Sequence, residues 1–185
     1  GGPRALRHVL SMLPGGGGTA YLIAQHMPAT FTSAFAERLD RALAPKVVLA
    51  ENNADVRPGQ VYICPGGHNM ELRANRGNWK LRVWRVEFED TAPSVDVLFQ
   101  SVAREYDGSV LGILLTGMGT DGGQGMQALM DVGGHTVAES AETAAVFGMP
   151  KEAVDRGAAK EVLPLGEIGV RLSQFARGEG VRSGQ

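Results

Sequence analysis

The sequence predicts an α/β protein built as one domain. Short apolar runs alternate along the chain with amphipathic stretches, which is the pattern of strands that alternate with helices. Many of the 26 glycines gather at 15–18 and at 117–125, as expected for turns and close backbone approaches. A chain of 185 residues buries roughly 70% of its unfolded surface, so it needs neither a disulfide nor a metal to fold.

The helices are expected where apolar residues recur at helical spacing. Pro3 lies near the start of the first helix, a position that proline favours. The second helix has Thr30 as its expected N-cap, and Ser94, after Pro93, is the expected cap of the third. In the second helix, apolar residues recur every four positions, at Phe31, Phe35, Leu39 and Leu43. The helices are expected at 3–12, 31–43, 95–106, around 126–130, 150–156 and 166–176.

The strands are expected as short apolar runs between turn residues. The run at 110–115 is the most apolar, and that at 19–24 is expected to be buried. Two runs on either side of Gly77 predict a short antiparallel hairpin. The strands are expected at 19–24, 47–50, 60–64, 69–73, 80–85, 110–115, 136–138 and 161–163.

Composition narrows the range of partners and cofactors. The net charge is −2, with 43% hydrophobic and 21% charged residues, which gives no reason to expect nucleic acid. No apolar run approaches the ~18 residues of a membrane span, so no membrane insertion is expected. Four histidines and one cysteine are too scattered along the sequence for a metal site of familiar spacing. The single Cys64 cannot form a disulfide within the chain, which favours the reducing cytoplasm. We therefore expect a cytoplasmic protein without metal or cofactor, and a monomer, because no helix has a uniformly apolar face.

His26 directly follows the buried run at 19–24. Ligands of open parallel sheets bind beyond the carboxyl ends of the strands, so His26 lies where an active site is expected. Position alone fits equally well a histidine that caps the next helix or packs under it.

Asp121 follows the strand expected at 110–115 and lies at the start of a helix. The helix dipole and free backbone N–H groups stabilise a carboxylate there, so Asp121 taken alone is more simply a helix cap. Together with His26 it suggests a catalytic triad, because an Asp can hold imidazole in the tautomer that accepts a serine proton. No serine lies in a G-x-S-x-G turn, and a capping role accounts for Ser94.

The same loop matches a dinucleotide-binding fingerprint. Residues 117–122 read Gly-Met-Gly-Thr-Asp-Gly, and Glu139 follows about 20 residues later, where a ribose-binding acid is expected. The charge of Asp121 would oppose a pyrophosphate, and the motif lies past the middle of the chain, which leaves little room for a full nucleotide fold. Dinucleotide binding is therefore the less favoured alternative.

Seven short stretches, in order along the chain, carry a family resemblance: Gly1–Pro3, Gln25–Pro28, Phe35–Leu39, Pro65–His68, Pro93–Phe99, Leu115–Gly122 and Val146–Pro150. Together they are highly specific, and they resemble the catalytic domain of the CheB-type chemotaxis methylesterases (protein-glutamate methylesterases). The resemblance extends from Gly1 to about Leu165. It implies a doubly wound, mostly parallel α/β sheet with helices on both faces. The catalytic domain is then expected over 1–177, followed by a polar tail at 178–185.

The resemblance also implies an activity and a site. Such enzymes hydrolyse glutamate γ-methyl esters on the cytoplasmic helices of methyl-accepting chemoreceptors, and some also deamidate receptor glutamines. His26 would be the general base, Asp121 its orienting acid, and the backbone N–H of Met118 part of the oxyanion hole. The family motif G-A-S-T-G-G contains the nucleophilic serine, and Gly1 and Gly2 resemble its last two letters. No cofactor or metal is implied.

Three departures from the family pattern stand out. The nucleophilic serine is not in the given chain, and we expect it just before Gly1. The family usually has a basic stretch before Pro-Ser-Val-Asp, whereas residues 87–90 are largely acidic here, which predicts altered substrate contacts. No receiver domain is included, so we expect either one upstream or another mode of regulation. A catalytically silent binding module of the same fold is the alternative to the enzyme.

Overall fold

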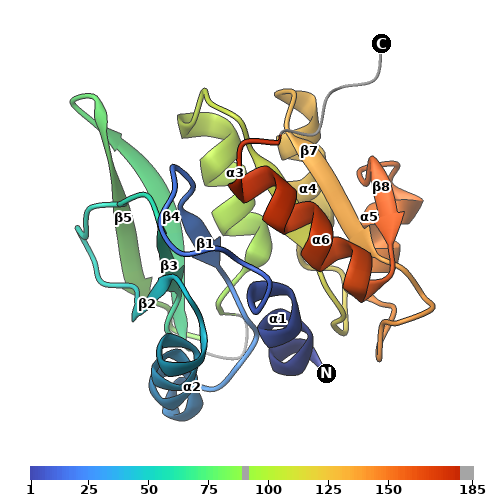
Figure 1. The fold of residues 1–185 in the computed structure, drawn as a ribbon, viewed down its shortest axis with the longest axis horizontal. Helices are drawn as coiled ribbons and strands as arrows, with labels where there is room; N and C mark the ends of the chain where they lie inside the picture. The colour runs from blue at the N-terminus through green and yellow to red at the C-terminus, as the bar shows by residue number, and fades with distance from the viewer. Residues whose placement is uncertain (89–91, 180–185) are drawn as a thin grey trace.

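The computed structural model describes residues 1–88 and 92–179 (Figure 1). Glu89 and Asp90 of the acidic stretch, and 180–185 of the expected tail, lie outside the described residues. The helices are α1 (Gly2–Leu10), α2 (Ala29–Ala42), α3 (Val95–Glu105), α4 (Gly123–Asp131), α5 (Met149–Asp155) and α6 (Leu165–Ala176). The strands are β1 (Tyr21–Ile23), β2 (Lys46–Leu49), β3 (Gln60–Ile63), β4 (His68–Asn75), β5 (Asn78–Arg85), β6 (Leu111–Leu114), β7 (His135–Glu139) and β8 (Glu161–Leu163).

The parallel strands form two three-stranded sheets. One has the order β1-β3-β2 and the other β6-β7-β8. In the first, Tyr62 lies opposite Leu22 and Val48, and every pairing in both sheets is parallel. β4 and β5 form the expected antiparallel hairpin, with Gly77 in its turn at a φ of 83°. The predicted α/β class, mostly parallel with one hairpin, is confirmed.

Helices cover both faces of the parallel strands (Figure 1). Side chains alternate between the two faces of a strand, so Val61 and Ile63 of β3 pack into one core cluster with α1, α2 and α6. Tyr62 and Cys64 pack into a second cluster with the hairpin and α3. A third cluster joins β6 to α3, α4 and α5. This arrangement is the doubly wound fold expected from the family resemblance.

A cavity of about 1880 Å³ lies between the facing edges of the two parallel sheets. β1 is an edge strand of one sheet and β6 is an edge strand of the other. Tyr21–Ile23 and Leu111–Leu114 both line this cavity, and Gly1 lines it as well. The start of the chain therefore lies at the space that separates the two sheets.

The start of α2 differs from the prediction. Pro28, not Thr30, is the N-cap, so Thr30 lies in the first turn of the helix. Phe31 is 61% exposed, although Phe35 and Leu39 of the same row are buried. An i, i+4 row drifts around a helix of 3.6 residues per turn, so the first member of the row reaches the surface while the later ones enter the core.

Gly66 is expected to tolerate no side chain. A Cβ at Gly66 would lie 2.5 Å from the backbone N of Ala29 and 2.7 Å from the carbonyl carbon of Pro28. Gly66→Ala therefore has to displace the backbone just after His26, and we expect it to lower the free energy of unfolding by about 2 kcal/mol or more. Urea unfolding measures this loss. Gly166→Ala in α6 is the matched control, because a Cβ there meets nothing within 4 Å; an equal loss in both variants would contradict the prediction.

Candidate active site

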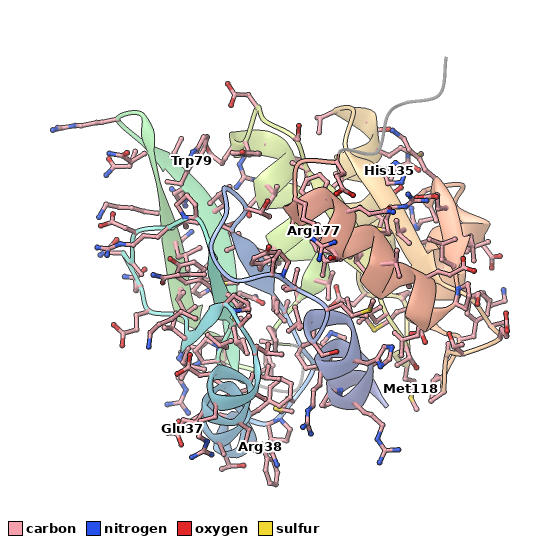
Figure 2. All side chains as sticks on the ribbon, viewed as in Figure 1. Glu37, Arg38, Trp79, Met118, His135 and Arg177 are labelled. Carbon is pink, nitrogen blue, oxygen red and sulfur yellow. The ribbon has the colours of Figure 1, made fainter. Side chains whose placement is uncertain are left out.

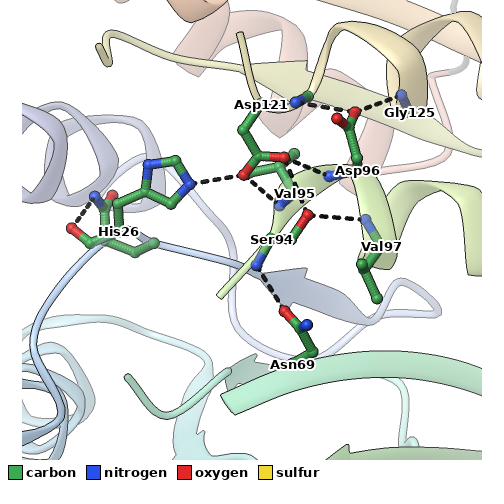
Figure 3. A network of polar contacts seen from close by, with 10 residues as sticks. His26, Asn69, Ser94, Val95, Asp96, Val97, Asp121 and Gly125 are labelled. Atoms are coloured by element: carbon green, nitrogen blue, oxygen red, sulfur yellow. Dashed lines mark hydrogen bonds and ion pairs between the residues drawn. The ribbon is translucent and has the colours of Figure 1, made fainter. Parts of the chain in front are cut away.

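His26 and Asp121 are 95 residues apart in the sequence, and the fold brings them into contact. Nε2 of His26 lies 2.7 Å from Oδ2 of Asp121 (Figure 3). His26 follows β1 and Asp121 follows β6, so both lie beyond the carboxyl ends of parallel strands. The imidazole is 41% exposed and the carboxylate 21%, so a substrate can reach the pair from the side of His26.

The contact assigns roles to the two imidazole nitrogens of His26. An ionised carboxylate only accepts hydrogen bonds, so Nε2 donates its proton to Asp121. Nδ1 is then the nitrogen that can accept a proton, as a general base must. In the best-known Ser-His-Asp triads the two nitrogens have the opposite roles, so a nucleophile here is expected on the Nδ1 side of the ring.

The carboxylate of Asp121 is held by the first turn of α3. Oδ2 accepts a hydrogen bond from the N–H of Val95 at 2.8 Å, and Oδ1 accepts one from the N–H of Asp96 at 2.9 Å. Burial alone would raise the pKa of Asp121, but the hydrogen bonds from His26, Asp96 and Val95 outweigh it and hold that pKa below its ordinary value. Asp121 is therefore ionised where it meets the imidazole.

Asp121 does not cap its own helix, which corrects the simpler interpretation of its sequence position. The N-cap of α4 is Gly122, with a φ of 99°. The carboxylate instead satisfies free N–H groups of α3, because the tertiary packing places the N-termini of α3 and α4 side by side (Figure 3).

Ser94 has a second role that the sequence did not reveal. As predicted, it caps α3 by accepting a hydrogen bond from the N–H of Val97. Its hydroxyl also donates to Oδ1 of Asp121 at 3.1 Å, and its backbone N–H donates to Oδ1 of Asn69 at 2.8 Å. Ser94 therefore supports the carboxylate, since its proton points to Asp121 and not to the imidazole. The only sequence signal for this was the Pro93–Phe99 stretch of the family resemblance.

Gly1, Gly2 and Met118 lie at the same end of the molecule as His26. A Cβ on Gly1 would lie 3.6 Å from Cγ2 of Thr116, and one on Gly2 would lie 2.7 Å from Nε2 of Gln25. The start of the chain thus lies between the loops that follow β6 and β1. Met118 is 81% exposed at this end (Figure 2), and all three residues line the cavity together with His26.

The geometry counts against dinucleotide binding. Glu139 is 0% exposed, and its carboxylate accepts hydrogen bonds from the N–H of Thr116 and the hydroxyl of Thr143. At the start of α4, the N–H groups of Gly122 and Gly125 donate to the carboxylate of Asp96. The acid expected on a ribose and the amides expected on a pyrophosphate are therefore both engaged within the protein.

His68 and His135 have hydrogen-bond partners other than His26 and Asp121. His68 begins β4, and its Nδ1 contacts the carbonyl oxygen of Gly66. His135 lies at the opposite end of the molecule from Met118 (Figure 2). Burial raises the pKa of the Cys64 thiol to about 12, so it is a poor nucleophile.

Across 1–88 and 92–179, no group of three or more His, Cys, Asp or Glu could hold a metal ion, and no helix has the length and apolarity to cross a membrane.

His135 and Arg171 both bind Glu161, which gives the fold a pH-dependent contact. Burial alone would raise the pKa of Glu161, but the hydrogen bonds from His135 and Arg171 hold it below its ordinary value. Such a carboxyl stabilises the fold above its unfolded pKa of about 4.3, and this contribution is lost as the pH falls through the folded value. Glu161→Gln should therefore lower the urea midpoint more at about pH 6 than at about pH 3. Glu142→Gln, at an exposed position, is the control; a Glu161→Gln effect that is as large at the acid pH as at about pH 6 would contradict the prediction.

Comparison with known protein families identifies the family of this chain. The CheB methylesterase family model matches residues 1–172. The chain belongs to the CheB methylesterase family. It is also similar to the crystal structure of the Thermotoga maritima CheB methylesterase catalytic domain, with a TM-score of 0.89 and 36% identity, over 95% of this chain and 93% of that one.

Relatives from two bacteria agree with this assignment. The chain is 42% identical to protein-glutamate methylesterase/protein-glutamine glutaminase 3 of Geobacter sulfurreducens over 94% of its own length and 47% of the relative. It is 43% identical to the protein with the same name and number 2 in Pseudomonas aeruginosa, over 98% of its own length and 53% of the relative. The chain therefore spans about half the length of these relatives.

Proposed function

We propose that this chain is the catalytic part of a protein-glutamate methylesterase that acts in the cytoplasm. Its substrates are glutamate γ-methyl esters on the cytoplasmic helices of chemoreceptors, and glutamine side chains are a second substrate class. The observation that carries the proposal is the 2.7 Å hydrogen bond between His26 and Asp121, beside the first residues of the chain. Relatives of this family bear both activities in their names.

The chemistry follows from the two nitrogens of His26. Nδ1 takes the proton of a serine hydroxyl as the serine oxygen attacks the ester carbonyl, and Asp121 stabilises the imidazolium that forms. The imidazolium returns its proton to the departing methoxide, so methanol leaves and an acyl-enzyme remains. Water then attacks the acyl-enzyme by the same proton transfers, which yields glutamate and restores the serine.

The serine is proposed to lie just before Gly1, on an extended segment in the cavity between β1 and β6. Two edge strands face this cavity, and each presents a row of backbone groups that one further parallel strand would pair. Such a strand would end beside the loops that carry His26 and Thr116, where Gly1 lies. A serine at that end reaches the site as nucleophiles at carboxyl ends of parallel strands do.

The oxyanion site is proposed at the backbone N–H of Met118. Met118 follows Thr116 by two residues, and a Cβ on Gly1 would lie 3.6 Å from Cγ2 of Thr116, so the loop that carries Met118 begins beside the start of the chain. A donor aimed at the developing oxyanion is worth about 10²–10³ in rate.

Two measurements test the proposed function. The first is the identity of the two residues that precede Gly1 in the full coding sequence; a serine supports the enzyme, whereas Ala or Gly in its place supports the silent binding module. The second is methanol release from methylated chemoreceptor by the protein that includes this segment. Loss of release in His26→Ala is expected, and an active His26→Ala variant would refute the triad.

Regulation is proposed to come from outside the described residues. The relatives are about twice as long as this chain, which leaves room for the receiver domain that the family resemblance implies. Methanol release by the full-length protein with and without a phosphoryl donor tests this point; equal rates would argue for another mode of control.

A further inference from the structure

Helices α3 and α4 begin side by side. The N-terminus of each helix donates hydrogen bonds to a carboxylate at or just before the start of the other helix. Asp121, just before α4, accepts hydrogen bonds from the first N–H groups of α3. Asp96, in the first turn of α3, accepts hydrogen bonds from the N–H groups of Gly122 and Gly125 at 3.0 and 2.7 Å (Figure 3). The two N-termini thus exchange carboxylates, and only the Asp121 carboxylate touches His26.

We propose that Asp96 is a positioning residue for the His26–Asp121 pair. By fixing the start of α4, its carboxylate sets the position from which Asp121 presents Oδ2 to Nε2 of His26. Asp96 acts only through Asp121 and has no contact with the reacting atoms. The importance of this role for catalysis rests on the function proposed above, but its effect on the hydrogen bond does not.

Close packing leaves the start of α4 few other positions. A Cβ on Gly125 would lie 2.6 Å from Cβ of Phe99 and 3.2 Å from Cα of Asp96. A Cβ on Gly122 would lie 2.6 Å from Cδ1 of Leu114. The glycines therefore allow the backbone of α4 to approach α3 closely enough for one carboxylate to bridge two N–H groups.

The negative charges of Asp96 and Asp121 repel each other, so each carboxylate needs hydrogen bonds from a helix N-terminus. Burial raises the pKa of Asp96, and the nearby charge of Asp121 raises it further, while the N–H groups of Gly125 and Gly122 lower it. Two carboxylates this close are stable together because each accepts hydrogen bonds at the positive end of a helix dipole. Removing one of them leaves N–H groups without their acceptor and frees the other helix to shift.

The test reads the hydrogen bond directly. The proton on Nε2 of His26, shared with Asp121, gives a downfield imidazole signal in a proton NMR spectrum of the chain, which needs no nucleophile or substrate. Asp96→Ala is expected to lose or shift this signal, because the start of α4 is released. Asp96→Asn is expected to keep it, because the amide oxygen still accepts from Gly122 and Gly125. Asp131→Ala, at the far end of α4, is the control that leaves the signal unchanged.

A second variant guards against a fold that fails in Asp96→Ala. Asp96→Glu keeps the negative charge in the first turn of α3 but moves the carboxylate by one methylene, so the signal is expected to shift in a folded protein. An unchanged signal in folded Asp96→Ala, or in Asp96→Glu if Asp96→Ala is unfolded, would overturn the proposal. In the protein that carries the serine, Asp96→Ala is expected to lower kcat about tenfold with KM unchanged. A loss of kcat without any change in the signal would assign Asp96 another role.

Discussion

Asp121→Asn is expected to lower kcat for ester hydrolysis by about 10⁴ in the protein that carries the serine. Both oxygens of the carboxylate accept hydrogen bonds from N–H groups that cannot reverse, those of Val95 and Asp96. An amide NH₂ must replace one oxygen, so it faces one of these donors in either orientation. When the NH₂ group faces Val95, it also donates a hydrogen bond to Nε2 of His26. The imidazole then carries its proton on Nδ1, and in this tautomer Nδ1 cannot act as the base. In both orientations the negative charge that stabilises the imidazolium is lost.

Methanol release from methylated receptor measures this effect, with kcat separated from KM. Asp131→Asn at the exposed end of α4 controls for the change of net charge, since Asp131 bonds only to Gln127 among the contacts of the described residues. The melting temperature of Asp121→Asn separates misfolding from the loss of chemistry. A fall in kcat of less than tenfold would show that Asp121 does not orient the base.

Most helices, strands and turns of the fold could be predicted from local sequence patterns. The apolar row of α2, the Ser94 cap of α3 and the turn at Gly77 all follow from the identity and spacing of neighbouring residues, and the structure confirms the cap and the turn. His26 was placed near a site because it follows a strand, and that argument needs only the direction of β1. Such signals are local, so a single sequence carries them.

The contacts around Asp121 were not readable in the same way. Its partners Ser94, Val95 and Asp96 lie 25 to 27 residues away along the chain. Sequence position suggested that Asp121 caps α4, because a helix start follows it directly. Which helix end receives a carboxylate depends on how two helices pack, and neither composition nor periodicity contains that information. The role of Ser94 at the carboxylate was missed for the same reason.

Glu139→Ala is expected to lower the free energy of unfolding by about 3 kcal/mol or more. Glu139 is fully buried at the end of β7, where it accepts hydrogen bonds from the N–H of Thr116 at 2.7 Å and the hydroxyl of Thr143 at 3.1 Å. Alanine leaves the N–H of buried Thr116 without an acceptor, at about 1–3 kcal/mol, and adds a cavity, whereas the hydroxyl of exposed Thr143 can turn to water. Urea unfolding measures the loss.

Glu139→Gln is the variant that isolates the cause. The amide oxygen can still accept from Thr116, and the amide nitrogen can donate to the Thr143 hydroxyl, which already accepts a hydrogen bond from Leu165. The expected loss is therefore about 1 kcal/mol, and equal losses in the two variants would show that the charge of the carboxylate, which both variants remove, matters more than hydrogen bonding or side-chain volume. Because Thr116 also lies against Gly1, Glu139→Ala should loosen the loop through Met118, and in the serine-bearing protein it should lower kcat even where the fold persists.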